Sequence, residues 1–275
     1  MEVRNAIHPR DFESYTTDKI RKEFLVQNLF VPGKLALTYS YYDRMIVGGA
    51  CPDKPLSLAA GKEIGSDYFL ARREMGIINV GANGAVTVDG EKYAIGTTDG
   101  LYVGMGSKKV VFTSEENDCP AHFYLLSGPA HREYPTTKMA MDDAEKTSLG
   151  STNESNTRTL NKYIHPDGVK SCQLVMGITT LEPGNVWNSM PCHTHERRME
   201  VYFYFNLADD AVVFHLMGKS NETRHIVIRN EEAVLSPSWS IHAGAGTSNY
   251  SFIWGMVGEN QTFTDMDSVA MDDLK

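Results

Sequence analysis

Short apolar runs separated by glycine, proline, asparagine or aspartate make up most of the chain. Runs of this length and punctuation are typical of strands in antiparallel sandwiches and barrels. In the first half the pattern predicts strands at 34–42, 76–80, 85–88, 91–95, 101–103, 109–113 and 122–126. In the second half it predicts strands at 173–179, 201–206, 211–216, 224–229, 233–235 and 250–256. We therefore expect a mainly β protein, built as antiparallel barrels or jelly rolls with few short helices.

The first half has one clear helical signal. In the segment 18–30, Ile20, Phe24, Leu25 and Leu29 recur at the spacing that places side chains on one face of a helix. This pattern predicts a short amphipathic helix.

A polar stretch separates the two sets of predicted strands. Residues 139–158 are rich in serine, threonine and asparagine, and they lack apolar periodicity, which predicts an exposed connection. We expect an N-terminal β module at 1–138, a linker at 139–158 and a C-terminal barrel at 159–275. Each module ends in an aromatic strand that runs into a glycine turn, at 122–131 and 250–260, a hint that the modules are related.

Composition and charge narrow the classes of partner. The 275 residues include 26 Lys and Arg against 35 Asp and Glu, a formal charge of −9 that repels phosphate backbones and anionic lipid heads. No apolar run reaches the roughly 18 to 20 residues that span a bilayer. Near the N-terminus, charged residues occupy the positions where a secretory signal peptide would have its apolar region. The four cysteines form no CxxC pair. We expect a cytoplasmic protein that binds neither nucleic acid nor membrane.

The chemistry is concentrated between residues 190 and 206. His193 and His195 are two residues apart, so both imidazoles lie on one face of a strand, and Glu200 follows five residues later. A tight turn at 196–198 would pair two strands and bring Glu200 beside the histidines. His242, five residues after a proline, supplies a third imidazole. The spacing H-x-H-x4-E followed by P-x4-H is the ligand pattern of cupin barrels.

This ligand set suits Zn²⁺, Fe²⁺, Mn²⁺ or Ni²⁺. A divalent ion with open positions could polarise a sugar carbonyl and support aldose–ketose isomerisation. With iron the same set could serve a non-haem dioxygenase, and without an exchangeable position it could belong to a non-catalytic sugar-binding cupin. An isolated histidine in a β protein is usually a surface or packed core residue, and we interpret the other six, His215 included, in that way.

Neighbouring residues favour a polar, anionic substrate. Tyr202 and Tyr204 lie on the same strand face as Glu200. Their hydroxyl groups could donate or accept protons or hydrogen bonds with the substrate. Cationic residues that could hold a carboxylate are Arg158, Lys162, Arg197, Arg198 and Arg224. The sequence does not identify the group that transfers the proton. Lys162 and Tyr202 are the catalytic candidates, and Arg197 and Tyr204 are the substrate-binding candidates.

Long strings of the chain resemble one family, the 5-dehydro-4-deoxy-D-glucuronate isomerases, also called 4-deoxy-L-threo-5-hexosulose-uronate ketol-isomerases. The resemblance is carried by PGNVWNSMPCHTHERRMEVYFYFNL (183–207), ETRHIVIRNEEAVLSPSWSIHAGAGT (222–247), FIWGMVGENQTFTDMD (252–267) and RTLNKYIHPDG (158–168). In the first half YSYYDRMIVGGACP (39–52) and REMGIINVGANGAVTVDG (73–90) also match.

The resemblance implies a two-module cupin whose C-terminal barrel binds one Zn²⁺ per chain through His193, His195, Glu200 and His242. It implies conversion of 5-dehydro-4-deoxy-D-glucuronate to 3-deoxy-D-glycero-2,5-hexodiulosonate in the breakdown of pectin and related uronate polymers. It also implies a homohexamer with a metal-free N-terminal module.

Overall fold

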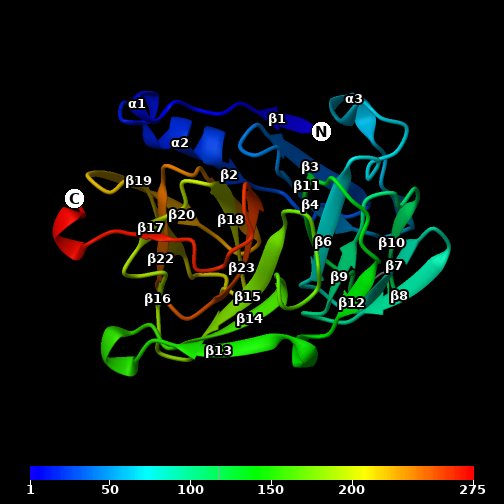
Figure 1. The fold of residues 1–275 in the computed structure, drawn as a ribbon. Helices are drawn as coiled ribbons and strands as arrows, with labels where there is room; N and C mark the ends of the chain where they lie inside the picture. Colours follow the sequence, from blue (N-terminus) through cyan, green and yellow to red (C-terminus); the bar gives the residue numbers. More distant parts are fainter. Residues whose placement is uncertain (117) are drawn as a thin grey trace. The chain divides into compact units, whose positions relative to one another are not determined.

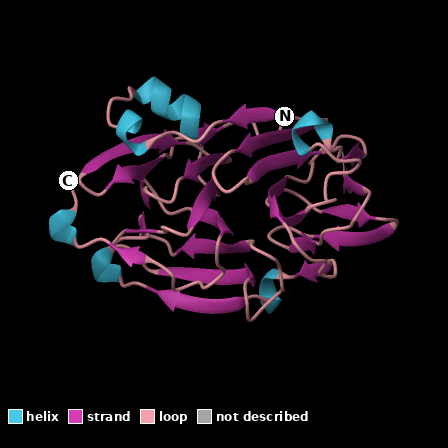
Figure 2. Cartoon of the chain, turned by 45° about the horizontal axis from the view of Figure 1, so that its top comes forward, coloured by secondary structure: helices cyan, strands magenta, loops and turns pink. Residues whose placement is uncertain are grey.

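The computed structural model describes residues 1–116 and 118–275, and strands make up most of its regular secondary structure (Figure 2). The chain forms two compact units. The first contains residues 1–4, 28–144 and 163–175, and the second contains residues 5–27, 145–162 and 176–275. The division therefore does not follow a single linker, since a segment near the N-terminus belongs to the second unit and residues 163–175 belong to the first.

The first unit contains a seven-stranded and a four-stranded sheet (Figure 1). The larger sheet has the order β1 (Glu2–Arg4), β3 (Lys34–Ser40), β4 (Ile46–Cys51), β11 (Phe123–Pro129), β6 (Arg73–Asn79), β9 (Gly100–Val103) and β12 (Thr137–Met139). The smaller has the order β5 (Leu56–Ser57), β10 (Val110–Ser114), β7 (Gly84–Val88) and β8 (Glu91–Ile95). Apolar side chains from both sheets, among them Ile77, Leu125 and Phe112, form one buried core. A short helix, α3 (Gly61–Ile64), lies between β5 and β6 in the chain.

The second unit repeats this plan. Its larger sheet has the order β13 (Glu145–Leu149), β14 (Arg158–Ile164), β15 (Val175–Leu181), β23 (Ser251–Gly258), β18 (Arg198–Phe205), β21 (Glu232–Ser236) and β2 (Leu25–Val26). Its smaller sheet has the order β16 (Trp187–Asn188), β22 (Ile241–Gly246), β19 (Val213–Lys219) and β20 (Glu222–Ile228). A short ribbon pairs β17 (His193–Thr194) with β24 (Asp267–Ser268). The two aromatic strands that hinted at a repeat, β11 and β23, each hold the fourth position of a seven-stranded sheet.

The predicted helix at 18–30 is shorter in the structure. The helix α2 spans Thr17–Phe24, follows the four-residue α1 (Pro9–Phe12), and is capped by Thr16, whose side chain accepts from the Lys19 amide. Leu25 adopts an extended backbone and pairs with Val234 of β21. The prediction failed because an apolar residue that continues a helical stripe can equally be buried by strand pairing.

The polar stretch at 139–158 contains a strand that its composition did not predict. The strand β13 pairs antiparallel with β14, and it forms the edge of its sheet (Figure 1). Four of its five residues are exposed, in agreement with the polar composition. Edge strands can be polar because only one of their sides is paired. Strand β14 was also not among the predicted strands.

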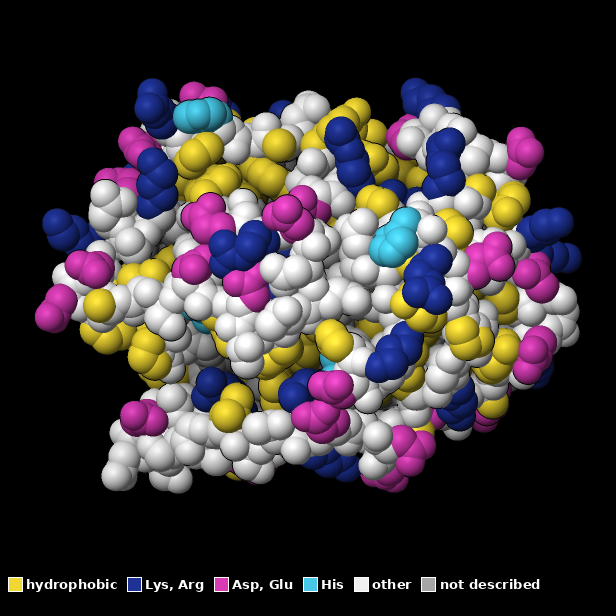
Figure 3. Space-filling model, in the orientation of Figure 1, with side chains coloured by type: hydrophobic (Ala, Val, Ile, Leu, Met, Phe, Trp, Pro, Cys, Tyr) yellow, Lys and Arg dark blue, Asp and Glu magenta, His cyan; other side chains and the backbone are white. Residues whose placement is uncertain are grey.

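Acidic and basic side chains are intermixed on the face drawn in Figure 3. Within the part of the chain that the structure describes, no helix has the length and apolar character needed to cross a membrane.

Candidate metal centre

Three strand regions of the second unit bring three imidazoles and one carboxylate to one point. They are His193 in β17, His195 just after it, Glu200 in β18 and His242 in β22, and one donor atom of each lies within 4.8 Å of the others. The Nε2 atom of His193 is 3.1 Å from Nε2 of His195 and 3.1 Å from Nε2 of His242. The Oε2 atom of Glu200 is 3.0 Å from Nε2 of His195 and 2.9 Å from Nε2 of His242.

These separations suit one small divalent cation. Donor atoms held about 2.1 Å from a single ion lie roughly 3.0 to 3.4 Å apart at neighbouring corners of an octahedron or a tetrahedron. Imidazole nitrogen and carboxylate oxygen are donors that zinc, iron and manganese accept. The donor set and its spacing therefore fit a metal ion.

The strand positions explain why the four side chains meet. Glu200 lies in the middle of a sheet, where it pairs with Ser236 on one side and Met256 on the other. The predicted turn at 196–198 is present, and the Arg198 amide donates to the His195 carbonyl oxygen at 3.3 Å. The predicted pairing is wrong, however, because β17 pairs with β24 rather than with β18. The partner strand of β17 comes from the C-terminal segment, and the sequence around the turn contains no information about that segment.

Contacts on the far side of two rings orient them. Nδ1 of His195 lies 2.9 Å from the carbonyl oxygen of Asp265, so this nitrogen carries the proton and Nε2 faces the other ligands. Nδ1 of His242 lies 3.3 Å from Oγ of Ser236. Partners of this kind fix the ring and tautomer of histidines that bind metals.

A buried arginine holds the segment that carries Asp265. The guanidinium of Arg198, which is 1% exposed, donates to the carbonyl oxygens of Thr262 at 2.8 Å, Phe263 at 3.1 Å and Asp265 at 3.2 Å. Its Nη2 atom also lies 3.4 Å from Nδ1 of His195. Arg198 is therefore placed to position His195 both directly and through the loop, and it is not among the residues that line the cavity.

The electrostatics of the cluster favour neutral imidazoles beside an ionised carboxylate. Burial, followed by the nearby imidazoles of His242 and His195, lowers the pKa of His193 to about 3. Burial opposes ionisation of Glu200, but His242 and His195 outweigh it and hold the Glu200 pKa below its ordinary value. Both effects leave lone pairs available at neutral pH, as metal binding requires.

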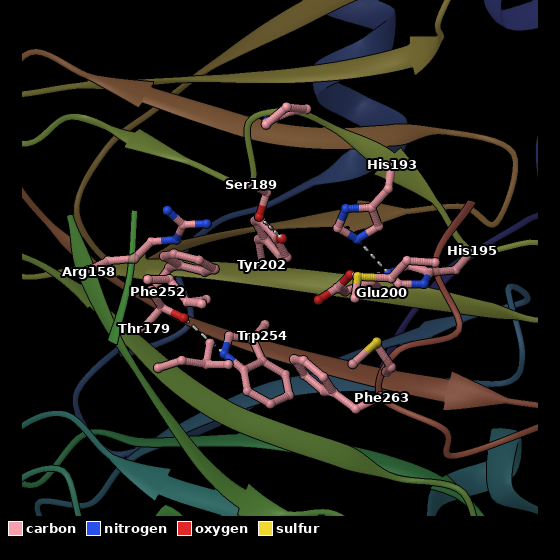
Figure 4. A pocket seen from close by; sticks show the side chains of 15 residues that line it. Arg158, Thr179, Ser189, His193, His195, Glu200, Tyr202, Phe252, Trp254 and Phe263 are labelled. Atoms are coloured by element: carbon pink, nitrogen blue, oxygen red, sulfur yellow. Dashed lines mark hydrogen bonds and ion pairs between the residues drawn. The ribbon is translucent and has the colours of Figure 1, made fainter. Parts of the chain in front are cut away.

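The cluster opens on a cavity of about 210 Å³. The large sheet supplies one wall through inward-facing residues on alternate positions of its strands (Figure 4). The lining residues are Leu149, Arg158, Leu160, Thr179, Ser189, Pro191, His193, His195, Glu200, Tyr202, Phe252, Trp254, Met256, Phe263 and Met266. Among these, Arg158 carries the one fixed positive charge, and it lies on the opposite side of Tyr202 from the two histidines in Figure 4.

Of the four residues predicted to be catalytic or to bind substrate, only Tyr202 is among the residues that line the cavity. Tyr202 lines the cavity, and its hydroxyl lies 2.7 Å from Oγ of Ser189, a residue that no sequence pattern singled out. Lys162 is not among the lining residues and is paired with Glu145 at 2.5 Å. Arg197 is likewise outside the lining, where two ion pairs, to Asp265 at 2.5 Å and Asp267 at 3.1 Å, hold it.

Tyr204 is buried and is not among the residues that line the cavity. Its hydroxyl is 2.7 Å from Nδ1 of His215, and both side chains are fully buried. Burial, and then the charge of His242, lower the pKa of His215 to about 3. His215 is thus a neutral core residue, which agrees with the interpretation from sequence.

Fold and site together define the class of protein. Two units of the same sheet plan, with three histidines and one glutamate inside one of them, describe a two-module cupin with a candidate metal centre. The fold is similar to an IolB-like protein from Salmonella typhimurium LT2, with a TM-score of 0.67 at 12% identity over 82% of this chain and 86% of that chain. It is also similar to the oxalate decarboxylase of Lactobacillus farciminis, with a TM-score of 0.54 at 10% identity over 83% and 79% of the two chains.

The chain belongs to the KduI/IolB family, whose model matches residues 24–272. A relative from Caldicellulosiruptor bescii is 59% identical and one from Escherichia coli is 56% identical, each over the full length of both chains. Both relatives are named 4-deoxy-L-threo-5-hexosulose-uronate ketol-isomerase. At this identity the chain is an enzyme, a ketol-isomerase, and so an intramolecular oxidoreductase.

Proposed function

We propose that this enzyme is a zinc-dependent aldose–ketose isomerase that converts 5-dehydro-4-deoxy-D-glucuronate to 3-deoxy-D-glycero-2,5-hexodiulosonate. The observation that carries the proposal is the cluster of His193, His195, Glu200 and His242 at the wall of a cavity. The side chain of Arg158 lines the same cavity and is positively charged. The names of the full-length relatives support the substrate.

The four residues would hold Zn²⁺ and leave positions free for substrate oxygens. Zinc bound there supplies Lewis acidity, which polarises a carbonyl without a change of redox state. Ketol isomerisation then moves one hydrogen between neighbouring carbons, either by proton transfer through an enediol or as a hydride.

Tyr202 is the side chain best placed to exchange a proton or hydrogen bond with the substrate. Burial, with the charge of Glu200 in addition, holds the Tyr202 pKa well above its ordinary value, so the phenol stays protonated. Its hydroxyl already lies 2.7 Å from Ser189 Oγ at the cavity wall. A protonated phenol donates to a substrate oxygen, which favours a role on the acid side of the reaction. The geometry favours Tyr202 over Lys162, whose ammonium is occupied by Glu145.

We also propose that the enzyme works in the cytoplasm, in the breakdown of pectin and related uronate polymers, as a homohexamer with one Zn²⁺ per chain. The family resemblance supports this setting. In such an assembly the first unit would serve packing and contacts between subunits. Light scattering of the purified protein measures the subunit number directly.

The test pairs metal content with turnover. Purified protein is analysed for metal by mass spectrometry, and the conversion of freshly prepared 5-dehydro-4-deoxy-D-glucuronate is followed by NMR. We expect about one zinc per chain and rapid conversion without O₂ uptake. In His242→Ala both should fall sharply, because one of four ligands is lost.

His225→Ala is the matched control, since His225 is exposed on β20 and outside the cavity. It should retain zinc and turnover. Activity that needs iron and consumes O₂ would instead support a dioxygenase with the same ligands. Zinc without conversion of any uronate would overturn the isomerase proposal and favour a sugar-binding cupin.

A further inference from the structure

The cavity beside the candidate metal centre is lined by many apolar side chains and by a single arginine. Its walls are mostly apolar, with Phe252, Trp254 and Phe263 among them. Arg158 is the one lining residue, among those described, that carries a fixed positive charge. It begins β14, opposite Leu149 of β13, and it shares its strand face with Leu160, which also lines the cavity.

The hydrogen bonds of Arg158 leave part of its guanidinium available. Nη1 donates to the Asn156 carbonyl oxygen at 2.7 Å, and no carboxylate of the described chain lies within ion-pair distance of Arg158. In contrast, Arg197 pairs with two aspartates, and Arg224 pairs with Glu222 at 2.5 Å. Arg158 is therefore a half-buried cation that forms no ion pair within the part of the chain that the structure describes, although the charge of Glu154 acts on it from a greater distance.

Such an arrangement is unfavourable unless an anion completes it. Burial lowers the pKa of Arg158, which means that the surroundings disfavour its charge. The apolar walls also strengthen any charge interaction inside the cavity, because they lower the local dielectric constant. A guanidinium fork matches the two oxygens of a carboxylate.

We infer that Arg158 binds the carboxylate of the sugar acid and so directs the opposite, carbonyl-bearing end of the substrate toward His193 and His195. Figure 4 shows Arg158 and the two histidines on opposite sides of Tyr202. Tyr202 and Ser189 then lie beside the middle of a ligand that reaches from the guanidinium to the metal centre. Arg158 is a specificity determinant: it selects acids over neutral sugars and sets the direction in which they enter. This inference rests on the proposed function for its substrate class.

A carboxylate could instead bind at the metal centre itself, so the experiment must separate the two positions. The probes are D-glucuronate and its neutral amide, D-glucuronamide, which differ at the acid group alone. Dissociation constants are measured by tryptophan fluorescence, since Trp254 lies in the cavity wall. Each protein is measured zinc-loaded and after chelation.

The variants are Arg158→Gln, Arg158→Lys and, as a control, Arg229→Gln. Arg229 is exposed, belongs to the same unit and lies outside the cavity, so its substitution removes the same charge elsewhere. Circular dichroism and zinc content establish that each variant is folded.

We expect the wild-type enzyme and Arg229→Gln to bind the acid roughly 10- to 100-fold more tightly than the amide, with or without zinc. Arg158→Gln should lose this preference, and Arg158→Lys should retain part of it because it keeps the charge but not the fork. With the natural substrate, Arg158→Gln should raise KM more than it lowers kcat.

The inference is overturned if Arg158→Gln still prefers the acid, or if the wild-type enzyme shows no preference. A preference that disappears on chelation but survives in Arg158→Gln would place the carboxylate on the metal. The dissociation constants are measured without turnover. A preference for the acid in a protein that shows no isomerisation would therefore contradict the proposed reaction but still support an anion site at Arg158.

Discussion

At the scale of single residues, spacing was sufficient to name the four residues that the structure brings together, but not the residues that surround them. Strand parity placed His193, His195 and Glu200 on inward faces, and the structure gathers them with His242. Arg197 seemed a good carboxylate partner because it lies next to the histidines in sequence. In the structure two aspartates occupy it, while Arg158, far away along the chain, faces the cavity.

Buried His215 predicts how stability depends on pH. Its pKa of about 3 in the folded state lies below the ordinary value of 6.5, so the unfolded state binds a proton more readily. Stability is fully present above pH 6.5 and is lost as pH falls from there toward 3. In metal-stripped protein we expect the free energy of unfolding to decrease over this window, with His215 contributing ~2 to 4 kcal/mol.

His215→Asn should show a shallower decrease, because asparagine cannot be protonated yet can still accept from the Tyr204 hydroxyl. Urea unfolding at a series of pH values measures the difference. Parallel curves for the two proteins would exclude a contribution from His215, and His225→Ala controls for the loss of an exposed histidine.

At the scale of elements, the predictions succeeded where alternation and turn residues dominate and failed where tertiary pairing decides. The helix at 18–30 ends early because Leu25 joins β21 through β2. The ligand turn formed as expected, but its first strand, β17, pairs with β24. The loop 262–265 just before β24 is consequently part of the site, since Asp265 orients His195 and Arg198 holds the loop.

The contacts of Arg198 with this loop and with the ring of His195 predict an effect of Arg198 on metal affinity. In Arg198→Met the carbonyl oxygens of Thr262, Phe263 and Asp265 lose their donor, so the contact that orients His195 should loosen. We expect zinc affinity to fall about 10- to 100-fold, as for other residues that support metal ligands. Competition with a calibrated chelator measures this affinity.

Arg197→Met is the comparison, because it removes a neighbouring, more exposed cation that binds the side chain of Asp265 and not the carbonyl oxygens of the loop. It should change zinc affinity much less. Equal zinc affinity in Arg198→Met and wild-type protein would show that the loop keeps His195 in place without the arginine.

At the scale of the whole molecule, two units share one sheet plan, but all four candidate ligands belong to the second. Ligand binding stabilises only the folded part that contains the site. Chelation of zinc should therefore lower the melting temperature of the second unit. The first unit should respond less, to the extent that the units unfold separately.

Differential scanning calorimetry with and without chelator checks this prediction, with readdition of zinc as the control. We expect a shift that zinc reverses and that is absent in His242→Ala, which lacks a ligand. A melting profile of the wild-type protein that does not respond to zinc would contradict a structural contribution of the metal.

The sequence by itself determined the mainly β class, the four residues of the candidate metal centre and the family resemblance. These features depend on local patterns: alternation along strands, turn residues, and short spacings that place side chains on one face. The tertiary structure alone decided that residues 5–27 join the second unit, that β24 pairs with β17, and that Arg158 faces the cavity beside the candidate metal centre. Each of these depends on contacts between segments far apart in the chain, where many pairings satisfy the same local pattern and the packing of the whole unit selects one.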